Sequence, residues 1–559
     1  MNRREFLNAR RALNRQKPSP SYHTARTLSG LTPYSGPFGT EEVVHLLKRA
    51  MFGAAPADVA YFKNGSMSAA VDELLNPTAP LPAPPVKDYD TADAGIPDTN
   101  IAPGATWVTD YVNVDGVISN NRRASFKKWG LGRMIHQDRS IREKMTLFFH
   151  NHFATESVGV EDPQCLYKHH TLLRVNAVGN FKALVRAVTI DPGMLMYLNG
   201  NLNTDTAADE NYARELQELF TLGKENNPNY TEDDVKAAAR VLTGWRIRNT
   251  DSTSYFEITK HDKNSKQFSS FYSNTAIAGQ TGATAGDTEL DALLDMIFNK
   301  KVEVSQFIVK KLYRWFCYYT IDAAAQANVI DPLAQIFRDN NWDIKPVLSA
   351  LFKSEHFFDV LNRGCLIKSP LDLIIMLCRE YELAFPDEAS QYADAYGMYE
   401  FLHLHGSLLN QDYGDPPSVS GWPSYYQAPN FYELWINSDT LPKRERFTDI
   451  LAVTGYMRGS STLKIDPIAF AQKMSNPGDP NVLITDSLAI LYRVPLSDAS
   501  RNIIKTNILL SGQTTDYYWT NAWNAYLSNP TDPASYQTVY TRLRDLYKYF
   551  MNLAEYQLA

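Results

Sequence analysis

The chain has 559 residues, of which 44% are hydrophobic and 21% are charged, and its formal net charge is −7. This composition is typical of a globular protein with a sizeable core and argues against a disordered chain. The negative net charge gives no attraction for nucleic acid, so a nucleic-acid-binding protein is disfavoured. The four cysteines are widely spaced and form no CxxC pair, which argues against a zinc cluster or a thioredoxin-type redox motif.

The N-terminal segment combines a twin-arginine-like sequence with a polar, basic arm over residues 1–36. Arg3 to Leu7 resemble an export motif, but residues 8–36 lack the apolar stretch that should follow. Two interpretations stay open. The arm lies on the acidic surface of a cytoplasmic protein, or the protein is extracytoplasmic and leaves by a twin-arginine-like route or with a signal-bearing partner. No run of 18 apolar residues occurs, so we expect no transmembrane helix.

Helical hydrophobic periodicity dominates the first half of the chain. Helices are predicted over residues 41–52, 56–64, 68–75, 141–153, 167–176, 181–189 and 235–245. Residues 77–104 are rich in proline and predict an extended surface excursion. Ser140 and Glu143 have the spacing of a capping box, as do Thr231 and Asp234. The helix over 141–153 is apolar on nearly all sides and should be buried.

The composition changes over residues 246–288, where Thr, Ser, Tyr and Gly become frequent. Residues 255–259 alternate as a strand does, which predicts a small β hairpin or insertion there. Helical patterns resume after residue 288, give way to loops over 386–440, and return from residue 444. We therefore predict a mainly α fold, with one large multi-helix domain over residues 37–450. Residues 451–559 would form a helical extension packed on this core.

A charged segment from Asp209 to Phe220 concentrates its polar residues on one stripe. At about 100° per residue, the stripe contains Asn211, Arg214, Glu215 and Glu218. The opposite side is apolar, and Gly223 stands where the helix should end. A polar stripe of this composition is typical of a metal site, a proton-transfer site or a buried ion network.

The carboxylates of this stripe allow two interpretations. Glu215 and Glu218 share a helix face, and such a pair raises the pKa of one carboxyl group toward that of a general acid, or supplies half of a metal site. Glu210 and Arg214 have the i, i+4 spacing of an ion pair. The alternative is therefore a structural network that joins helices.

Two histidines, His150 and His152, lie at the end of the apolar helix. On a regular helix their side chains point about 200° apart, so they can share a metal only if the helix ends at His150. Together with carboxylates they would suit zinc, iron or manganese. The alternative is a pair of hydrogen-bonded core histidines.

Two further segments contain residue types that suit acid–base chemistry or aromatic packing. His261 and Asp262 follow the predicted strand and could act in acid–base chemistry, or form an ordinary surface turn. Residues 416–423, with Trp422, predict a rigid aromatic loop that has a packing role or, as the alternative, forms a ligand platform. No G-x-S-x-G, P-loop, Rossmann glycine fingerprint, H-E-x-x-H or EF-hand sequence occurs, which argues against nucleotide chemistry.

Several motifs, taken in order, resemble a bacterial family known as domain-of-unknown-function family 1800. They lie at residues 45–53, 142–153, 180–181, 210–223, 242–245, 261–262, 368–370 and 416–423. The resemblance extends over roughly residues 40–450 and implies a mostly helical fold without an established activity. It also implies that members are often exported. They are frequently encoded beside domain-of-unknown-function family 1501, which looks like the sulfatase and alkaline-phosphatase group.

The leading hypothesis is a metal- or carboxylate-dependent enzyme, hydrolase-like, with its site where the His150/His152 helix meets the Glu210–Glu218 helix. The predicted metal ligands are His150, His152, Glu215 and Glu218. The predicted catalytic residues are Glu215, Glu218, Arg214, His261 and Asp262. The alternative is a non-enzymatic binding or assembly protein that acts with the sulfatase- or phosphatase-like partner, its ionic helix being structural. A haem or another organic cofactor against the histidine helix is a third interpretation.

Overall fold

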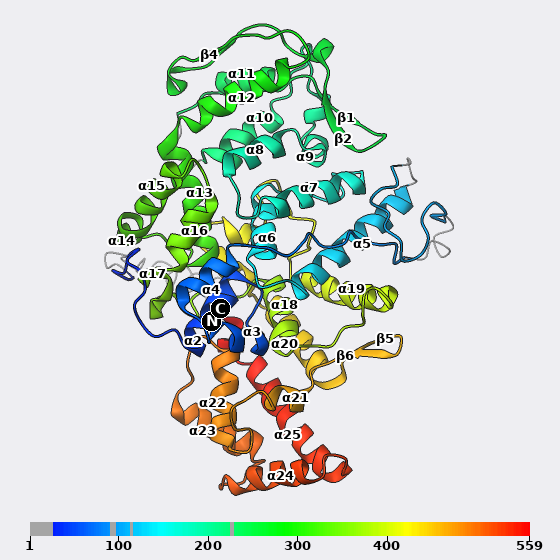
Figure 1. The fold of residues 1–559 in the computed structure, drawn as a ribbon, viewed down its shortest axis with the longest axis vertical. Helices are drawn as coiled ribbons and strands as arrows, with labels where there is room; N and C mark the ends of the chain where they lie inside the picture. The colour runs from blue at the N-terminus through cyan, green and yellow to red at the C-terminus, as the bar shows by residue number, and fades with distance from the viewer. Residues whose placement is uncertain (1–25, 90–96, 112–115, 224–228) are drawn as a thin grey trace, which may run out of the picture.

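The computed structural model describes residues 26–89, 97–111, 116–223 and 229–559. Within them helices dominate, and the strands form three two-stranded antiparallel sheets, so the predicted mainly α fold is confirmed. The helices are stacked along the long axis, from α11 and α12 at one end to α24 and α25 at the other (Figure 1). The twin-arginine-like sequence Arg3–Leu7 and residues 90–96 of the proline-rich excursion lie outside the described residues.

The first half of the chain supplies the upper and central helices (Figure 1). They are α2 (Thr40–Ala50), α3 (Pro56–Phe62), α4 (Met67–Leu74), α5 (Gly116–Ile135), α6 (Arg142–His152), α7 (Pro163–Val175), α8 (Phe181–Thr189), α9 (Pro192–Tyr197), α10 (Asn211–Glu215), the π-helical turn η2 (Leu216–Thr221), α11 (Glu232–Val241), α12 (Ala285–Phe298) and α13 (Lys301–Phe316).

The second half continues through the centre and builds the opposite end. Its elements are α14 (Ala323–Ala325), α15 (Asp331–Asp339), α16 (Ile344–Phe352), α17 (Glu355–Phe358), α18 (Pro370–Glu380), α19 (Tyr392–Leu408), η7 (Pro423–Tyr425), η8 (Phe431–Trp435), α20 (Thr440–Asp449), α21 (Pro467–Ala471), α22 (Pro480–Leu491), α23 (Asp498–Ile504), η10 (Lys505–Leu509), α24 (Tyr517–Ser528) and α25 (Pro533–Met551).

Helix α2 is unusual because every residue from Glu42 to Ala50 is buried. It contacts α3 and α22, and His45 shares a hydrogen bond of 2.9 Å with the backbone oxygen of Phe357. After the helix, Gly53 adopts a φ of +89°, a left-handed conformation that glycine takes at little cost. A helix buried on all sides must also bury its charged residues, which determines the interior described below.

The β insertion predicted near residues 246–288 is present as two small hairpins. Strand β1 (Trp245–Arg248) pairs with β2 (Thr253–Phe256), and β3 (Lys266–Gln267) pairs with β4 (Ala276–Ile277). The strand predicted over 255–259 is shifted, because a 3-10 turn occupies Ile258–Lys260. A third hairpin, β5 (Tyr456–Arg458) with β6 (Ser461–Leu463), lies in the segment that was predicted to be helical.

The two predicted capping boxes have different outcomes. Thr231 caps α11 as predicted: its hydroxyl accepts from the Asp234 N–H, and the Asp234 carboxylate accepts from the Thr231 N–H. The box at Ser140 and Glu143 is wrong. Glu143 instead makes a two-pronged ion pair with Arg174 of α7, at 2.8 and 2.9 Å. A buried arginine, which the local sequence pattern cannot reveal, takes the carboxylate that would have capped the helix.

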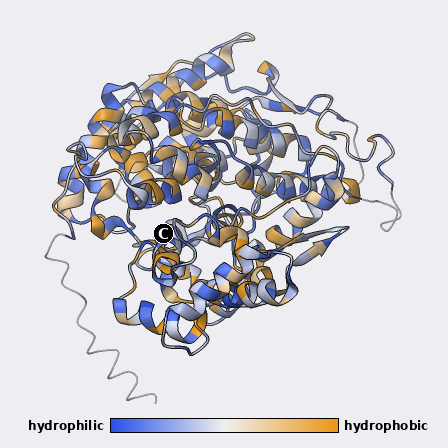
Figure 2. Ribbon diagram, turned by 60° about the horizontal axis from the view of Figure 1, so that its bottom comes forward, coloured by the Kyte–Doolittle hydropathy of each residue, from blue (hydrophilic) through white to orange (hydrophobic). Residues whose placement is uncertain are grey.

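One contiguous hydrophobic core runs from Val43 to Tyr556 and includes buried side chains of the last hundred residues. Hydrophobic and hydrophilic residues alternate along most helices, as expected of amphipathic helices around a core (Figure 2). The chain returns to the centre at its end, where the Lys368 N–H donates to the oxygen of Gln557 and the Ala559 N–H donates to the oxygen of Leu366, each at 2.8 Å. Within the described part of the chain, no helix is long and apolar enough to cross a membrane.

Among the glycines of α5, Gly130 leaves the least space for a side chain. A Cβ atom there would lie 2.0 Å from Cε1 of Tyr413, a side chain excluded from solvent. We therefore expect Gly130→Ala to lower the free energy of unfolding by about 1–3 kcal/mol through overpacking, although alanine favours a helix by about 1 kcal/mol. Gly116→Ala is the matched control, since nothing lies within 4 Å of its added Cβ. Chemical denaturation of both variants tests this, and equal stability would contradict the close approach.

Candidate functional site

The two predicted ligand histidines point to different neighbours, because α6 continues through His152. His150 packs in a ring cluster: its centroid lies 4.3 Å from that of His170 and 5.6 Å from that of Tyr413. Neither ring nitrogen of His150 has a hydrogen-bond partner, and neither has Nε2 of His170. Burial lowers the pKa of His150 to about 3, with the neighbouring His169 and Lys127 contributing, so this imidazole is neutral at physiological pH.

Both ring nitrogens of His152 are engaged. Nδ1 accepts from the ammonium of Lys311 at 2.9 Å, and Nε2 bonds the backbone oxygen of Phe220 at 3.1 Å. Burial, followed by the positive charge of Lys311, lowers the pKa of His152 well below its usual value. The histidine helix thus contacts the glutamate segment through the hydrogen bond between His152 and the backbone oxygen of Phe220.

The glutamate segment is helical but changes its winding. It runs as α10 to Glu215 and then as the π-helical turn η2, where the Thr221 hydroxyl donates to the oxygen of Leu216 at 2.5 Å. Of the predicted stripe, Asn211 is exposed, whereas Arg214, Glu215 and Glu218 are half-buried. Gly223 has a φ of +76° where the helix ends, as the sequence indicated.

Arg214 lies between two carboxylates. Its guanidinium is 3.1 Å from Glu210, the predicted partner, and 2.6 Å from Glu232 at the start of α11. The hydrogen bond to Glu232 leads the interactions that raise the pKa of Arg214 above its usual value. Because the Arg214 side chain is 34% exposed, solvent screens these pairs and their net contribution is small.

His261 and Asp262 are tied into the base of the β insertion. His261 is buried, with Nδ1 2.9 Å from the oxygen of Thr243 and Nε2 3.0 Å from Glu289. Asp262 accepts from Arg240 at 2.6 Å, and its pKa is lowered by Arg240 against the opposing effect of burial. These side chains hold the insertion against α11 and α12.

The structure does not gather the predicted metal ligands. Among the residues that it describes, no three His, Cys, Asp or Glu side chains are placed to hold a metal ion. His150 belongs to the ring cluster with His170 and Tyr413, His152 is bonded to Lys311 and Phe220, and Glu215 and Glu218 are half-buried on the glutamate segment. Because α6 remains helical through His152, the side chains of His150 and His152 point to different neighbours, as their i, i+2 spacing predicts.

A different polar centre lies where α2, α6 and α18 meet. The basic chamber is lined by Lys48, Arg49, Lys144, Trp315, Leu366, Ile367, Lys368, Asp372, Tyr425, Tyr432 and Ala559. Its four basic residues come from three of the motifs noted in the sequence, at residues 45–53, 142–153 and 368–370. It encloses about 20 Å³. Sequence reasoning gave these residues no role.

Two of the four cations of the basic chamber have carboxylate partners. Lys48 pairs with Glu380 of α18, both side chains being excluded from solvent, and Lys144 pairs with Asp372. The remaining two, Arg49 and Lys368, are 3% and 1% exposed. Arg49 donates to the backbone oxygens of Asn362 and Ala559, at 3.0 and 2.8 Å.

A signal for the chamber was present in the sequence. Lys48 and Arg49 are flanked by Leu46, Leu47, Ala50 and Met51, and Lys144 directly precedes the apolar part of α6; all three are buried. Lysine and arginine are almost never fully buried unless they are paired. Charged residues inside apolar helices therefore indicate an internal ionic site, but only the fold shows that these three meet.

The fold defines the class of this protein, which is mainly helical and has a large hydrophobic core with an internal ionic centre. The chain belongs to the family described as "Protein of unknown function (DUF1800)", whose family model matches residues 45–558. The match continues well beyond residue 450, so the C-terminal helices are part of what the family model covers. No curated protein and no solved structure matches the chain.

The buried histidines predict acid sensitivity. The pKa of His150, His152 and His170 is lowered by burial, so protons bind to the unfolded chain first, near pH 6.5. The stability that these neutral rings contribute is present above that pH and is lost as the pH falls toward their folded values. Below pH 6 the unfolding free energy should fall less steeply with pH in His150→Gln, with the slope smaller by up to about 1.4 kcal/mol per pH unit. Urea unfolding at several pH values measures this, and an unchanged slope would contradict it.

Proposed function

We propose that this protein is a non-enzymatic binding or assembly protein in which the glutamate segment is a structural ion network. The observation that carries the proposal is the position of Arg214 between Glu210 and Glu232, which links α10 to α11. An arginine placed in this way is engaged by Glu210 and Glu232 and links the two helices, instead of presenting its guanidinium to an anionic substrate. A catalytic carboxylate pair would instead need an unneutralised site within reach of a substrate.

The other candidate residues support the same proposal. His152 is bonded to Lys311 and Phe220, and His261 is bonded to Glu289 and Thr243. Each links two or three elements that are distant in the sequence, as a structural hydrogen bond does. The competing proposal, a metal- or carboxylate-dependent hydrolase with Glu215 and Glu218 as ligands or acid and base, requires these side chains to gather around a metal or a substrate.

Metal analysis of the purified protein distinguishes the two proposals. We expect no stoichiometric metal and no change in metal content in Glu215→Ala. We also expect the unfolding free energy of that variant to fall by no more than about 1 kcal/mol, since Glu215 is half-buried. Glu161→Ala, at an exposed position, is the matched control. A stoichiometric metal that is lost in Glu215→Ala alone would replace the binding proposal with the enzymatic one.

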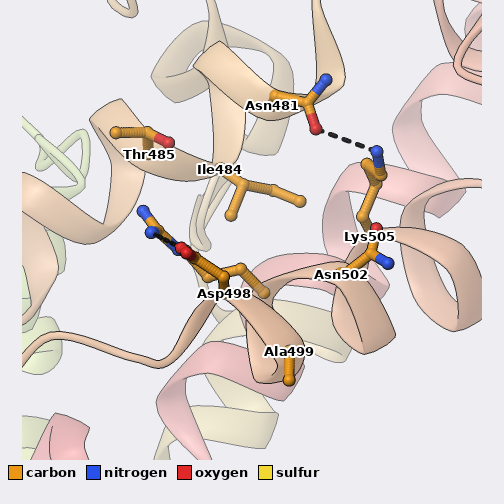
Figure 3. A pocket seen from close by; sticks show the side chains of 8 residues that line it. Asn481, Ile484, Thr485, Asp498, Ala499, Asn502 and Lys505 are labelled. Atoms are coloured by element: carbon orange, nitrogen blue, oxygen red, sulfur yellow. Dashed lines mark hydrogen bonds and ion pairs between the residues drawn. The ribbon is translucent and has the colours of Figure 1, made fainter.

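An assembly role needs an exposed surface, and the C-terminal helices offer one. A hollow of about 540 Å³ lies between α22 and α23, with Asn481, Thr485 and Asn502 among its lining residues (Figure 3). Exposed apolar side chains lie on α23 and on the following helix α24: Ile503 is 57% exposed and Tyr517 is 67% exposed. We propose this surface as the contact for the sulfatase- or alkaline-phosphatase-like partner that the family resemblance implies.

Co-purification with such a partner tests the contact. Asn502→Trp places a bulky ring in the hollow and should weaken the complex by at least about tenfold, since hot spots of interfaces lie in packed pockets. Ala534→Trp, exposed on α25 outside the hollow, should leave binding unchanged. Equal binding by both variants and the unmodified protein would place the contact elsewhere.

A further inference from the structure

The basic chamber holds more basic side chains than the carboxylates of the protein can neutralise. Its cations are Lys48, Arg49, Lys144 and Lys368, and the carboxylates paired with them belong to Glu380 and Asp372. Even if the Ala559 oxygen that Arg49 binds is counted as a full negative charge, one cation remains. An isolated buried charge is costly, and proteins pair such charges or keep them neutral.

The chamber also has N–H donors without acceptors. Nζ of Lys368, Nε and Nη1 of Arg49, and Nε1 of Trp315 are all buried and without a hydrogen-bond partner. All three residues line the same chamber. Lys368 contacts the Tyr556 ring, with Nζ 3.8 Å from the ring centroid, but this leaves its N–H groups without an acceptor. Buried donors are nearly always satisfied, so unmatched donors around one cavity indicate an acceptor that the chain does not supply.

The size of the cavity limits the identity of that acceptor. The chamber encloses about 20 Å³, and a single water needs about 10–15 Å³ on the same measure. A sulfate or phosphate group, with five heavy atoms, exceeds this space. A monatomic anion such as chloride is comparable in size to this space, and its single negative charge would balance the remaining cation.

We propose that the basic chamber binds one monovalent anion of halide size, with chloride as its chemical type, between Lys368, Arg49 and Trp315. The site goes beyond the binding or assembly role proposed above and does not depend on it. The anion would tie α2, α13 and α18 together, since these elements or their immediate flanks supply its donors. In the empty chamber, burial and the neighbouring Lys48 lower the pKa of Lys368 well below its usual value, and a bound anion would restore its charge.

Thermal unfolding in sodium chloride and in sodium gluconate at equal ionic strength tests the site. A ligand that binds only the folded state stabilises it in proportion to its saturation. We expect a saturable rise in Tm with chloride and not with gluconate. In Lys368→Met the chloride midpoint should shift by at least about tenfold, because a charge-assisted contact is lost. Lys63→Met, the same change at an exposed position, should respond as the unmodified protein does.

Crystals of the full chain grown with sodium bromide decide the outcome. An anomalous scattering peak within hydrogen-bonding reach of Lys368 and Trp315, absent in Arg49→Lys or Lys368→Met, supports the proposal even if the change in Tm is small. Each variant probes the site independently, so a failure of one to fold leaves the other as a test. A chamber without a bromide peak, filled by water alone, overturns the proposal whatever the thermal data show. Neither result bears on the metal analysis of Glu215→Ala, so the two proposals fail separately.

Discussion

The ion pair between Lys48 and Glu380 is the constraint around which the centre of the molecule is organised. Both side chains are excluded from solvent, so the desolvation cost of two charges is offset only if they remain together and well bonded. Lys48 lies on a helix that is buried on all sides, and Glu380 lies at the end of α18. The ion pair therefore fixes the position of the two helices relative to each other, and it thereby also positions the elements packed around them.

Local sequence patterns predict much of the fold, but they do not predict the buried ionic centre. Helical periodicity predicted most helices, Thr231 and Asp234 predicted the start of α11, and Gly223 predicted the end of the glutamate segment. These features depend on neighbours within a few residues. The Ser140 capping box failed because its carboxylate is taken by Arg174, a residue of another helix that no local pattern brings near.

The candidate site shows the same division between local and long-range information. The polar stripe and the pairing of Glu210 with Arg214 were readable from helix geometry, and both are present. The second partner, Glu232, and the ring cluster of His150 with His170 and Tyr413 depend on how distant segments meet. Residue types at a helix surface thus indicate that a site or a network exists, but the chemistry depends on the residues that arrive from elsewhere.

The return of the chain to its own centre has a consequence for biosynthesis. Arg49 and the Ala559 oxygen that it binds are separated by 510 positions, and Lys368 bonds Gln557 through the backbone. During synthesis from the N-terminus, the cations of α2 are made long before their last partners. A partly synthesised chain must hold those charges in water, so the interior can close only after nearly all of this sequence has left the ribosome.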